Sequence, residues 1–255
     1  MGQPSAGGRT LTVAVPAYNE AGNLEKAVQS AVEAAREFDD FEILIVDDCS
    51  QDGTAEVADT LAALDPHITA FHHPENLGFA AAYRTAMARA KMRYFTFVPG
   101  DGEVLPESIK AIFAAVGEAD LVVPYHATPW ARPWLRRVLT WASTTEINWL
   151  FGWHLRYYQG PTVYPTALAR ALPHEATGFF FATEMLVHAL SAGCTWVEVG
   201  LAHHERVYGR SKAVAWRNIL NAESTILRLW WTIRIRQTKI AAEVSNNIPA
   251  EVMET

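Results

Sequence analysis

The sequence of 255 residues predicts an α/β fold, in which a mainly parallel sheet carries helices on both faces. Two observations lead to this prediction. From Leu11 to about Pro124, short apolar segments alternate with longer segments whose apolar residues follow the period of a helix. The short segments are also rich in branched residues, as strands buried on both faces of a parallel sheet are. Half of the residues are hydrophobic, so the chain can bury a large core.

The first half is expected to alternate strands with helices. Asn19 follows the first strand and is expected to cap the first helix, because an Asn side chain can bind the free amides at a helix start. The Ala-rich segment that begins at Phe79 is expected to form the third helix. The strands are expected at residues 12–15, 43–46, 68–71, 94–98 and 121–124, and the helices at residues 24–35, 57–64, 79–90 and 109–116.

After residue 124 the sequence changes character and is expected to extend the first half. A strand near Val163, a helix at 183–192, a strand at 195–199 and a long helix at 213–236 should follow one another. Between residues 130 and 158, tryptophan alternates with arginine. This pattern suits a surface in the lipid headgroup region, and it equally suits aromatic packing in a core or a homodimer interface.

Composition and charge exclude several classes of protein. The formal net charge of −7 argues against a nucleic-acid binder, which needs a basic face. Cys49 and Cys194 are the only cysteines, so the sequence predicts no disulfide framework and a reducing, cytoplasmic location. No window reaches the ~18 consecutive apolar residues of a membrane span. We therefore expect a protein that is soluble or at most a peripheral membrane protein.

Polar residues follow two of the expected strands directly. Asp47 and Asp48 come after the strand at 43–46, and Tyr18 and Glu20 come shortly after the strand at 12–15. Ligands of open α/β sheets bind beyond the carboxyl ends of the strands, where these side chains should meet. The sequence therefore predicts a nucleotide pocket at this edge of the sheet.

Two further loops carry groups that suit phosphate chemistry. Asp101 and Glu103 lie on a glycine-containing turn after the strand at 94–98, and hard oxygen ligands of this kind suit Mg²⁺ or Mn²⁺ on a diphosphate. The alternative is a solvated turn with stray acids. Arg206, Ser211 and Lys212 form a donor-rich loop that could close over phosphate oxygens, unless it is only a charged surface loop.

Taken together, these segments resemble the family 2 glycosyltransferases, and within them the dolichyl- or polyprenyl-phosphate sugar synthases. The resemblance runs from about Leu11 to Lys212 and rests on five segments in the family's order. The segments are Val15-Pro16-Ala17-Tyr18-Asn19-Glu20, Val46-Asp47-Asp48-Cys49-Ser50-Gln51-Asp52-Gly53-Thr54, Asn76-x-Gly78, Gly100-Asp101-Gly102-Glu103 with Pro106-Glu107, and Arg206-Val207-Tyr208-Gly209-Arg210-Ser211-Lys212.

The resemblance implies a GT-A fold and the inverting transfer of one sugar from a nucleotide-diphosphate donor. It implies a metal site for Mg²⁺ or Mn²⁺ at Asp101 and Glu103. The residues implied in donor binding are Pro16, Ala17, Tyr18, Glu20, Asp47, Asp48, Gly78, Gly100, Asp101, Gly102, Arg206, Ser211 and Lys212. Those implied in catalysis are Asp101, Glu184, Arg206 and Lys212.

The resemblance also divides the chain into expected segments. The donor would bind to an α/β half at residues 11–125, and the acceptor to a second half at residues 126–240 that includes the C-terminal helix. Residues 1–10 are expected to be a disordered N-terminus, and residues 241–255 a flexible tail.

The sequence departs from the family's pattern at three places. The usual Asp-x-Asp reads Pro99-Gly100-Asp101, so the first carboxylate is missing, although Glu103 offers a second ligand. The family's acidic motif at a helix start reads Thr183-Glu184-Met185, which leaves Glu184 as the candidate base for a hydroxyl acceptor. Arg156 stands where the synthases have Asp, so the acceptor pocket differs.

These departures favour a polyprenyl phosphate as acceptor, because a phosphate is already an anionic nucleophile and needs no base. Such an acceptor places the protein at the inner face of the cell membrane. One alternative is a soluble glycosyltransferase that acts on a hydroxyl of a small molecule or glycan. An alternative of another class is a catalytically weakened protein that only binds nucleotide sugars.

Overall fold

The computed structural model describes residues 8–128, 130, 134–176, 178, 180–202 and 225–235 of the chain. The predictions for the two termini fall almost wholly outside these residues. Within the described part, no helix is both long enough and apolar enough to cross a membrane.

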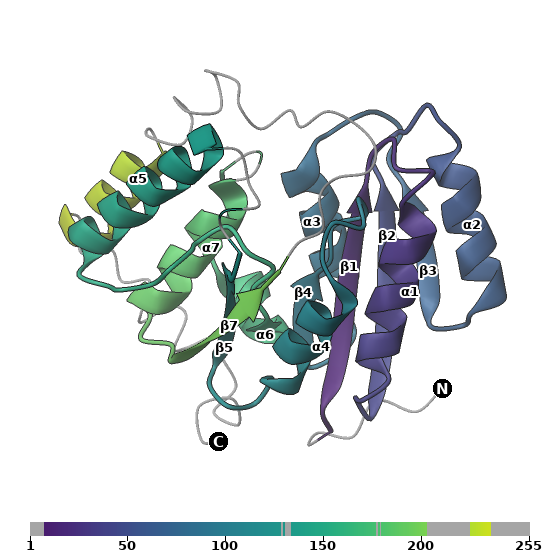
Figure 1. The fold of residues 1–255 in the computed structure, drawn as a ribbon, viewed down its shortest axis with the longest axis horizontal. Helices are drawn as coiled ribbons and strands as arrows, with labels where there is room; N and C mark the ends of the chain where they lie inside the picture. The colour runs from purple at the N-terminus through teal and green to yellow at the C-terminus, as the bar shows by residue number, and fades with distance from the viewer. Residues whose placement is uncertain are drawn as a thin grey trace.

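The main sheet confirms the predicted α/β fold (Figure 1). Its strands run in the order β3-β2-β1-β4-β6, and the pairs among the first four are all parallel. The last strand, β6, is short and pairs antiparallel with β4. The strands are β1 (Thr10–Ala17), β2 (Asp40–Asp47), β3 (Ile68–His72), β4 (Tyr94–Phe97) and β6 (Tyr164–Pro165).

Helices cover both faces of this sheet because its central strands are apolar on both faces. Val13 and Ile43 pack into one hydrophobic cluster, and their chain neighbours Ala14 and Leu44 pack into the other, as the two-residue period of a strand requires. The first cluster includes α1 (Leu24–Ala35), α2 (Thr54–Leu64) and α4 (Pro106–Ala114); the second includes α3 (Phe79–Arg89), α6 (Thr166–Ala171) and α7 (Phe180–Ser191).

The fifth predicted strand forms, but it lies outside the main sheet. This strand, β5 (Leu121–His126), pairs in parallel with β7 (Trp196–Leu201) in a second sheet of two strands. An isolated antiparallel bridge joins Val122 of β5 to Val163, just before β6. At Gly160 a Cβ would lie 2.8 Å from the carbonyl oxygen of Pro124, so only glycine lets the segment before β6 approach β5 this closely.

Two helices lie at the end of the molecule away from α2 (Figure 1). The first, α5 (Trp134–Phe151), occupies the Trp- and Arg-containing region and packs against the core through Ile147 and Phe151. The second covers residues 225–230 and continues as the π-helical turn η2 (Trp231–Ile235), within the long helix predicted at 213–236. Residues 213–224 and 236 of that prediction lie outside the described residues.

A matched pair of leucine substitutions tests the assignment of the core. Leu11 on β1 is fully buried, whereas Leu64 at the end of α2 is 77% exposed. We expect Leu11→Ala to lower the free energy of unfolding by about 2–5 kcal/mol, because it removes apolar contacts and leaves a cavity. Leu64→Ala should change it by no more than about 0.5 kcal/mol. Urea denaturation measures both values, and equal losses would contradict the burial of β1.

Candidate active site

The carboxyl ends of the parallel strands meet at one edge of the sheet, as predicted. Ala17 at the end of β1 pairs with Asp47 at the end of β2, which pairs with His72 at the end of β3. The loop after β4 reaches the same edge, because the Gly100 amide donates to the carbonyl of Pro16 at 3.2 Å. The loops that carry the predicted donor-binding residues of the first half therefore begin side by side.

Hydrogen bonds brace the loops after β1 and β2 against each other. The Asn19 amide donates to Ser50 Oγ at 2.9 Å, and Asn19 Oδ1 accepts from the Gln51 amide at 2.8 Å. Asn19 adopts a φ of 56°, which costs energy in a non-glycine residue and is held here by these two bonds. The prediction that Asn19 caps α1 is therefore wrong. Asn23 occupies the N-cap position, and the Asn19 side chain binds the neighbouring loop instead.

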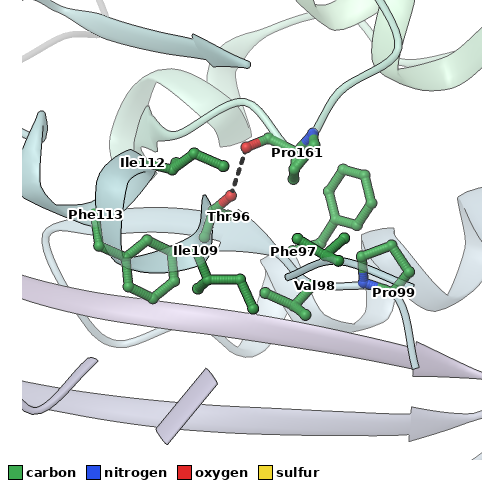
Figure 2. Close-up of a pocket in the computed structure, with 9 residues that line it drawn as sticks. Thr96, Phe97, Val98, Pro99, Ile109, Ile112, Phe113 and Pro161 are labelled. Atoms are coloured by element: carbon green, nitrogen blue, oxygen red, sulfur yellow. Dashed lines mark hydrogen bonds between the residues drawn. The ribbon is translucent and has the colours of Figure 1, made fainter. Parts of the chain in front are cut away.

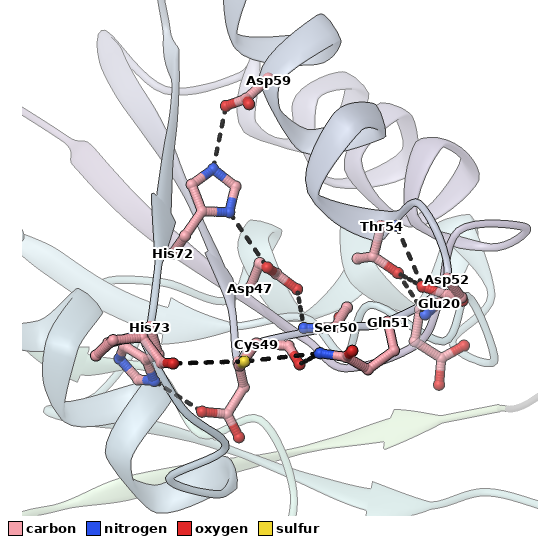
Figure 3. Close-up of polar contacts among 12 residues, drawn as sticks. Glu20, Asp47, Cys49, Ser50, Gln51, Asp52, Thr54, Asp59, His72 and His73 are labelled. Atoms are coloured by element: carbon pink, nitrogen blue, oxygen red, sulfur yellow. Dashed lines mark hydrogen bonds and ion pairs between the residues drawn. The ribbon is translucent and has the colours of Figure 1, made fainter.

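The next residues of the β1 loop are joined to the start of α2. The Glu20 amide donates to Thr54 Oγ1 at 2.8 Å (Figure 3). The Ala21 amide donates to Asp52 at 3.3 Å. Asp52 also accepts from the Thr54 amide at 3.1 Å. The side chains of Pro16, Tyr18 and Glu20 stay partly exposed at this edge, where a nucleoside could reach them, whereas Ala17 is buried.

Asp48 is buried and holds the loop between β3 and α3. Its carboxylate is bonded to His73 Nδ1 at 2.7 Å and accepts from the amides of Leu77 at 2.9 Å and Gly78 at 2.7 Å. His73 is in turn bonded to Thr85 on α3 at 2.9 Å. Asp48 thus shapes the rim of the predicted nucleoside pocket, and its direct contact with a nucleoside stays a prediction.

Asp47 is also buried, and it binds a histidine and its own loop. Its Oδ1 accepts from the Ser50 amide at 3.2 Å, and its Oδ2 accepts from His72 Nδ1 at 3.2 Å. The other ring nitrogen of His72 faces Asp59 at 3.1 Å (Figure 3). Burial disfavours the charged ring, but hydrogen bonds to Asp47 and Asp59 outweigh this effect and raise the pKa of His72. Donor contact by Asp47 likewise stays a prediction.

The predicted metal loop lies against the end of β1. A Cβ at Gly100 would lie 3.0 Å from the Pro16 carbonyl oxygen and 3.2 Å from the Ala17 Cβ, so glycine permits this approach. Asp101 Oδ1 accepts from the Glu103 amide at 3.1 Å, in a turn that Gly102 completes with a φ of 64°.

The two carboxylates of this loop fit a hard divalent cation in kind. Asp101 and Glu103 are both partly exposed, so an ion and a diphosphate could reach them. Among the residues that the structure describes, no group of three or more His, Cys, Asp or Glu side chains could hold a metal ion. Asp101 and Glu103 would by themselves fill only part of a coordination shell, and diphosphate oxygens and water complete such shells at typical Mg²⁺ sites.

A small apolar cavity lies behind this loop (Figure 2). Thr96 contributes the hydroxyl there, and it donates to the Pro161 carbonyl at 3.1 Å. No cationic side chain of the described residues lines this cavity, so it does not suit a diphosphate. We interpret it as a small gap in the apolar packing behind the loop. Its lining residues are Thr96, Phe97, Val98, Pro99, Val104, Ile109, Ile112, Phe113 and Pro161.

Glu184, the candidate base, is buried on α7 and is only 1% exposed. Its Oε2 accepts from the Ala176 amide at 2.6 Å, and its Oε1 accepts from Arg228 Nη2 at 2.5 Å. Arg228 also binds Glu175 at 2.5 Å and thereby ties the last described helix to α7. One turn along α7, burial and then the Arg228 charge lower the pKa of His188 to about 4. The role of Glu184 as a base stays a prediction.

The pairing of Arg228 with Glu175 and Glu184 was not predicted from the sequence, because nothing local marks pairs that lie 53 and 44 residues apart. Arg156, expected in the acceptor pocket, stacks on the Tyr125 ring at 4.2 Å, and its amide donates to Glu198 at 2.9 Å. Arg206, Ser211 and Lys212 lie outside the described residues, so their predicted closure over the phosphates is untested.

Comparison with known sequences identifies relatives over most of the chain. The family model described as "Glycosyl transferase family 2" matches residues 12–168. The undecaprenyl-phosphate mannosyltransferase of Micrococcus luteus is 30% identical over 80% of this chain and 87% of its own length. The polyprenol monophosphomannose synthase of Mycolicibacterium smegmatis is 30% identical over 89% and 88%, respectively. The glycosyltransferase AglD of Haloferax volcanii is 32% identical, but this chain spans only 39% of its length.

Comparison with solved structures supports the predicted GT-A architecture. The glucosyl-3-phosphoglycerate synthase of Mycobacterium tuberculosis, crystallised in complex with UDP, superposes with a TM-score of 0.65. The match covers 87% of this chain and 80% of that chain at 18% sequence identity, so it concerns the fold. Other crystals of the same synthase contain Mn²⁺ or Mg²⁺ together with UDP.

The raised pKa of His72 predicts how stability changes with pH. A histidine with a raised folded-state pKa stabilises the fold fully below its unfolded pKa of about 6.5, and this contribution is lost as the pH rises through the folded-state pKa. The stability difference between wild type and His72→Gln should therefore shrink as the pH rises from 6 to 8. Asp59→Asn should weaken this dependence, because it removes one carboxylate. Urea unfolding at each pH measures it, and a difference that grows with pH would contradict the assignment.

Proposed function

The chain belongs to glycosyl transferase family 2, and from this membership we propose that it moves one sugar, with inversion, from a nucleotide-diphosphate donor to a polyprenyl phosphate. The observation that carries the proposal is the meeting of the β1, β2 and β4 loops at one sheet edge, with Asp101 at the last of them. Ligands of open α/β folds bind at such an edge.

The names of two relatives support the acceptor. Both are polyprenyl-phosphate mannosyl enzymes by name, and this chain covers more than four fifths of each. The hydrogen bonds of Glu184 support the same acceptor. One of its carboxylate oxygens accepts from the Ala176 amide and the other from Arg228, so neither is directed at a hydroxyl acceptor. A phosphate monoester is largely ionised at neutral pH and needs no base, whereas a hydroxyl would need one.

The proposed reaction breaks the bond between the anomeric carbon and the diphosphate oxygen. A phosphate oxygen of the acceptor attacks the anomeric carbon from the opposite side, and the nucleoside diphosphate leaves with the bonding electrons. Asp101 and Glu103 would hold Mg²⁺ or Mn²⁺, which supplies positive charge to the leaving diphosphate. Arg206, Ser211 and Lys212 would donate to the same oxygens.

The hydrogen-bonded loops of the first half would bind the donor before the sugar is transferred. Pro16, Tyr18 and Glu20 would contact the nucleoside, and Asp48 would keep the Leu77–Gly78 amides fixed at the rim of its pocket. A rigid pocket spends less binding energy on ordering itself, so more remains for orienting the sugar. A polyprenyl acceptor would bring the enzyme to the cytoplasmic face of a membrane as a peripheral protein.

Substitution of Asp101 tests whether the chain is an enzyme or only a binding protein. We expect Asp101→Asn to reduce kcat with Mn²⁺ by at least about 10²-fold, because a charge that stabilises the leaving group is lost. Asp40→Asn is the matched control, since Asp40 is an exposed residue at the opposite end of β2. Transfer of a radiolabelled sugar to polyprenyl phosphate measures both variants. Activity of Asp101→Asn close to that of Asp40→Asn would exclude the proposed metal role, and a wild type without transfer would favour a binding protein.

Acceptors that differ only in the phosphate test the acceptor class. We expect transfer to a polyprenyl phosphate and none to the corresponding polyprenol, because the anionic oxygen is the nucleophile. A thermal-shift screen of GDP-, UDP- and dTDP-sugars first identifies the donor, since a bound ligand raises the melting temperature. Equal transfer to the free alcohol, together with a pH profile that Glu184→Gln shifts, would instead indicate a hydroxyl acceptor with Glu184 as base.

A further inference from the structure

His73, the residue that follows β3, links the Asp48 carboxylate to α3. Its Nδ1 lies 2.7 Å from Asp48 Oδ1, and its Nε2 lies 2.9 Å from Thr85 Oγ1. The His73 amide donates to the Asp47 carbonyl at 2.9 Å, so its backbone is fixed as well. The His73 side chain is 8% exposed and that of Asp48 is 5% exposed, so the contact between them is largely shielded from water. His73 is therefore held at both ring nitrogens in one orientation.

The two partners of His73 determine which of its nitrogens carries hydrogen. A carboxylate only accepts, so Nδ1 is the donor to Asp48. In the neutral ring Nε2 is then an acceptor, and the Thr85 hydroxyl donates to it. The hydrogen bond at one ring nitrogen sets the tautomer at the other, so Thr85 favours the form of His73 that binds Asp48.

His73 binds one oxygen of Asp48 and thereby orients the other. Among the described residues, Oδ1 accepts from His73 and from the Leu77 amide, whereas Oδ2 accepts from the Gly78 amide. A carboxylate oxygen can accept two hydrogen bonds, so these contacts leave Oδ2 able to accept one more. The two oxygens belong to one planar group. The bond from His73 to Oδ1 therefore helps to set the direction of this remaining acceptor position.

We propose that His73 is a positioning residue for the donor, and that it holds Asp48 in the orientation in which Oδ2 accepts from an N–H or O–H of the nucleoside. Thr85 supports this role from α3. The inference rests on the proposed function, because it takes a nucleotide-diphosphate sugar as the ligand at this sheet edge. It adds the two side chains that orient the predicted contact. His73 acts through Asp48, so it contributes to donor affinity and takes no part in breaking the glycosidic bond.

Two substitutions of His73 that each keep one nitrogen test this proposal. The side-chain nitrogen of Asn is as many bonds from Cα as Nδ1 of His, and that of Gln is as many as Nε2. We therefore expect His73→Asn to bind GDP or UDP like wild type. His73→Gln should raise the Kd by about tenfold, which corresponds to the loss of one hydrogen bond to a charged group. Titration calorimetry with the full chain measures both.

Two further positions extend the test and control it. Thr85→Val removes the hydroxyl at nearly constant shape and should also raise the Kd, whereas Thr85→Ser keeps the hydroxyl and should bind like wild type. His67→Gln is the matched control. His67 Nδ1 is bonded to Asp65 at 2.8 Å, so it is also a histidine paired with a carboxylate, but it lies at the opposite end of β3. Its substitution should leave nucleotide binding unchanged.

Two readouts separate positioning from a general loss of structure. His73→Gln should raise the KM for the donor and leave kcat unchanged, because it removes binding that the ground state and the transition state share. It should also bind pyrophosphate with Mn²⁺ like wild type, because pyrophosphate has no nucleoside. Equal weakening of pyrophosphate and nucleotide binding would overturn the proposal.

The remaining outcomes distinguish this proposal from the proposed function. A Kd of His73→Gln equal to that of wild type, or of His73→Asn equal to that of His73→Gln, would overturn the role of His73 and leave sugar transfer intact. Nucleotide binding by wild type without sugar transfer would overturn the proposed function alone. Absence of binding to GDP, UDP and dTDP by wild type would overturn both.

Discussion

The carboxylate of Asp48 is 4% exposed and is hydrogen-bonded to three groups. The arrangement of the loops at the candidate site depends on these hydrogen bonds. His73 and the amides of Leu77 and Gly78 bind it, and the Asp48 amide itself donates to the Ala17 carbonyl at 2.9 Å. One residue therefore connects the ends of β1, β2 and β3 to the start of α3. A buried carboxylate is tolerated only when its oxygens are hydrogen-bonded. The loop amides therefore stabilise the buried carboxylate, and the carboxylate holds the loop in its conformation.

The contacts that hold the loops and helices in place differ between the two halves of the chain. In the first half, backbone amides and short polar side chains brace loops that are adjacent in the sheet. In the second half, the buried Glu184 binds Arg228, and glycine at 160 allows close contact with Pro124. The proposed acceptor would meet elements held by an ion pair in which only the Glu184 carboxylate is buried, whereas the proposed donor would meet loops that are hydrogen-bonded along a sheet edge.

Much of the fold could be predicted because its signals are local. The period of the apolar residues located β1 to β4 and their helices, and the rule for parallel sheets located the site edge. The pairing of β5 with β7 could not be predicted, because a strand's partner is decided by distant residues. The inward direction of Asp47 and Asp48 was missed for a similar reason, since their partners His72 and His73 lie 25 residues away. Trp134, Trp141 and Trp149 are spaced with a helical period. The alternation of tryptophan with arginine alone did not decide whether these side chains are exposed or packed in a core.

The exposed tryptophans also determine what optical spectroscopy can report about this protein. Trp130, Trp134, Trp141 and Trp149 are between 69% and 81% exposed in the folded chain, so their indoles already experience water. Unfolding changes the surroundings of these four rings little, and their emission would dilute the signal of the partly buried Trp153 and Trp230. Intrinsic fluorescence is therefore a weak probe of denaturation here, and circular dichroism is the better one. Transfer of the same rings into a less polar medium would shift their emission to the blue.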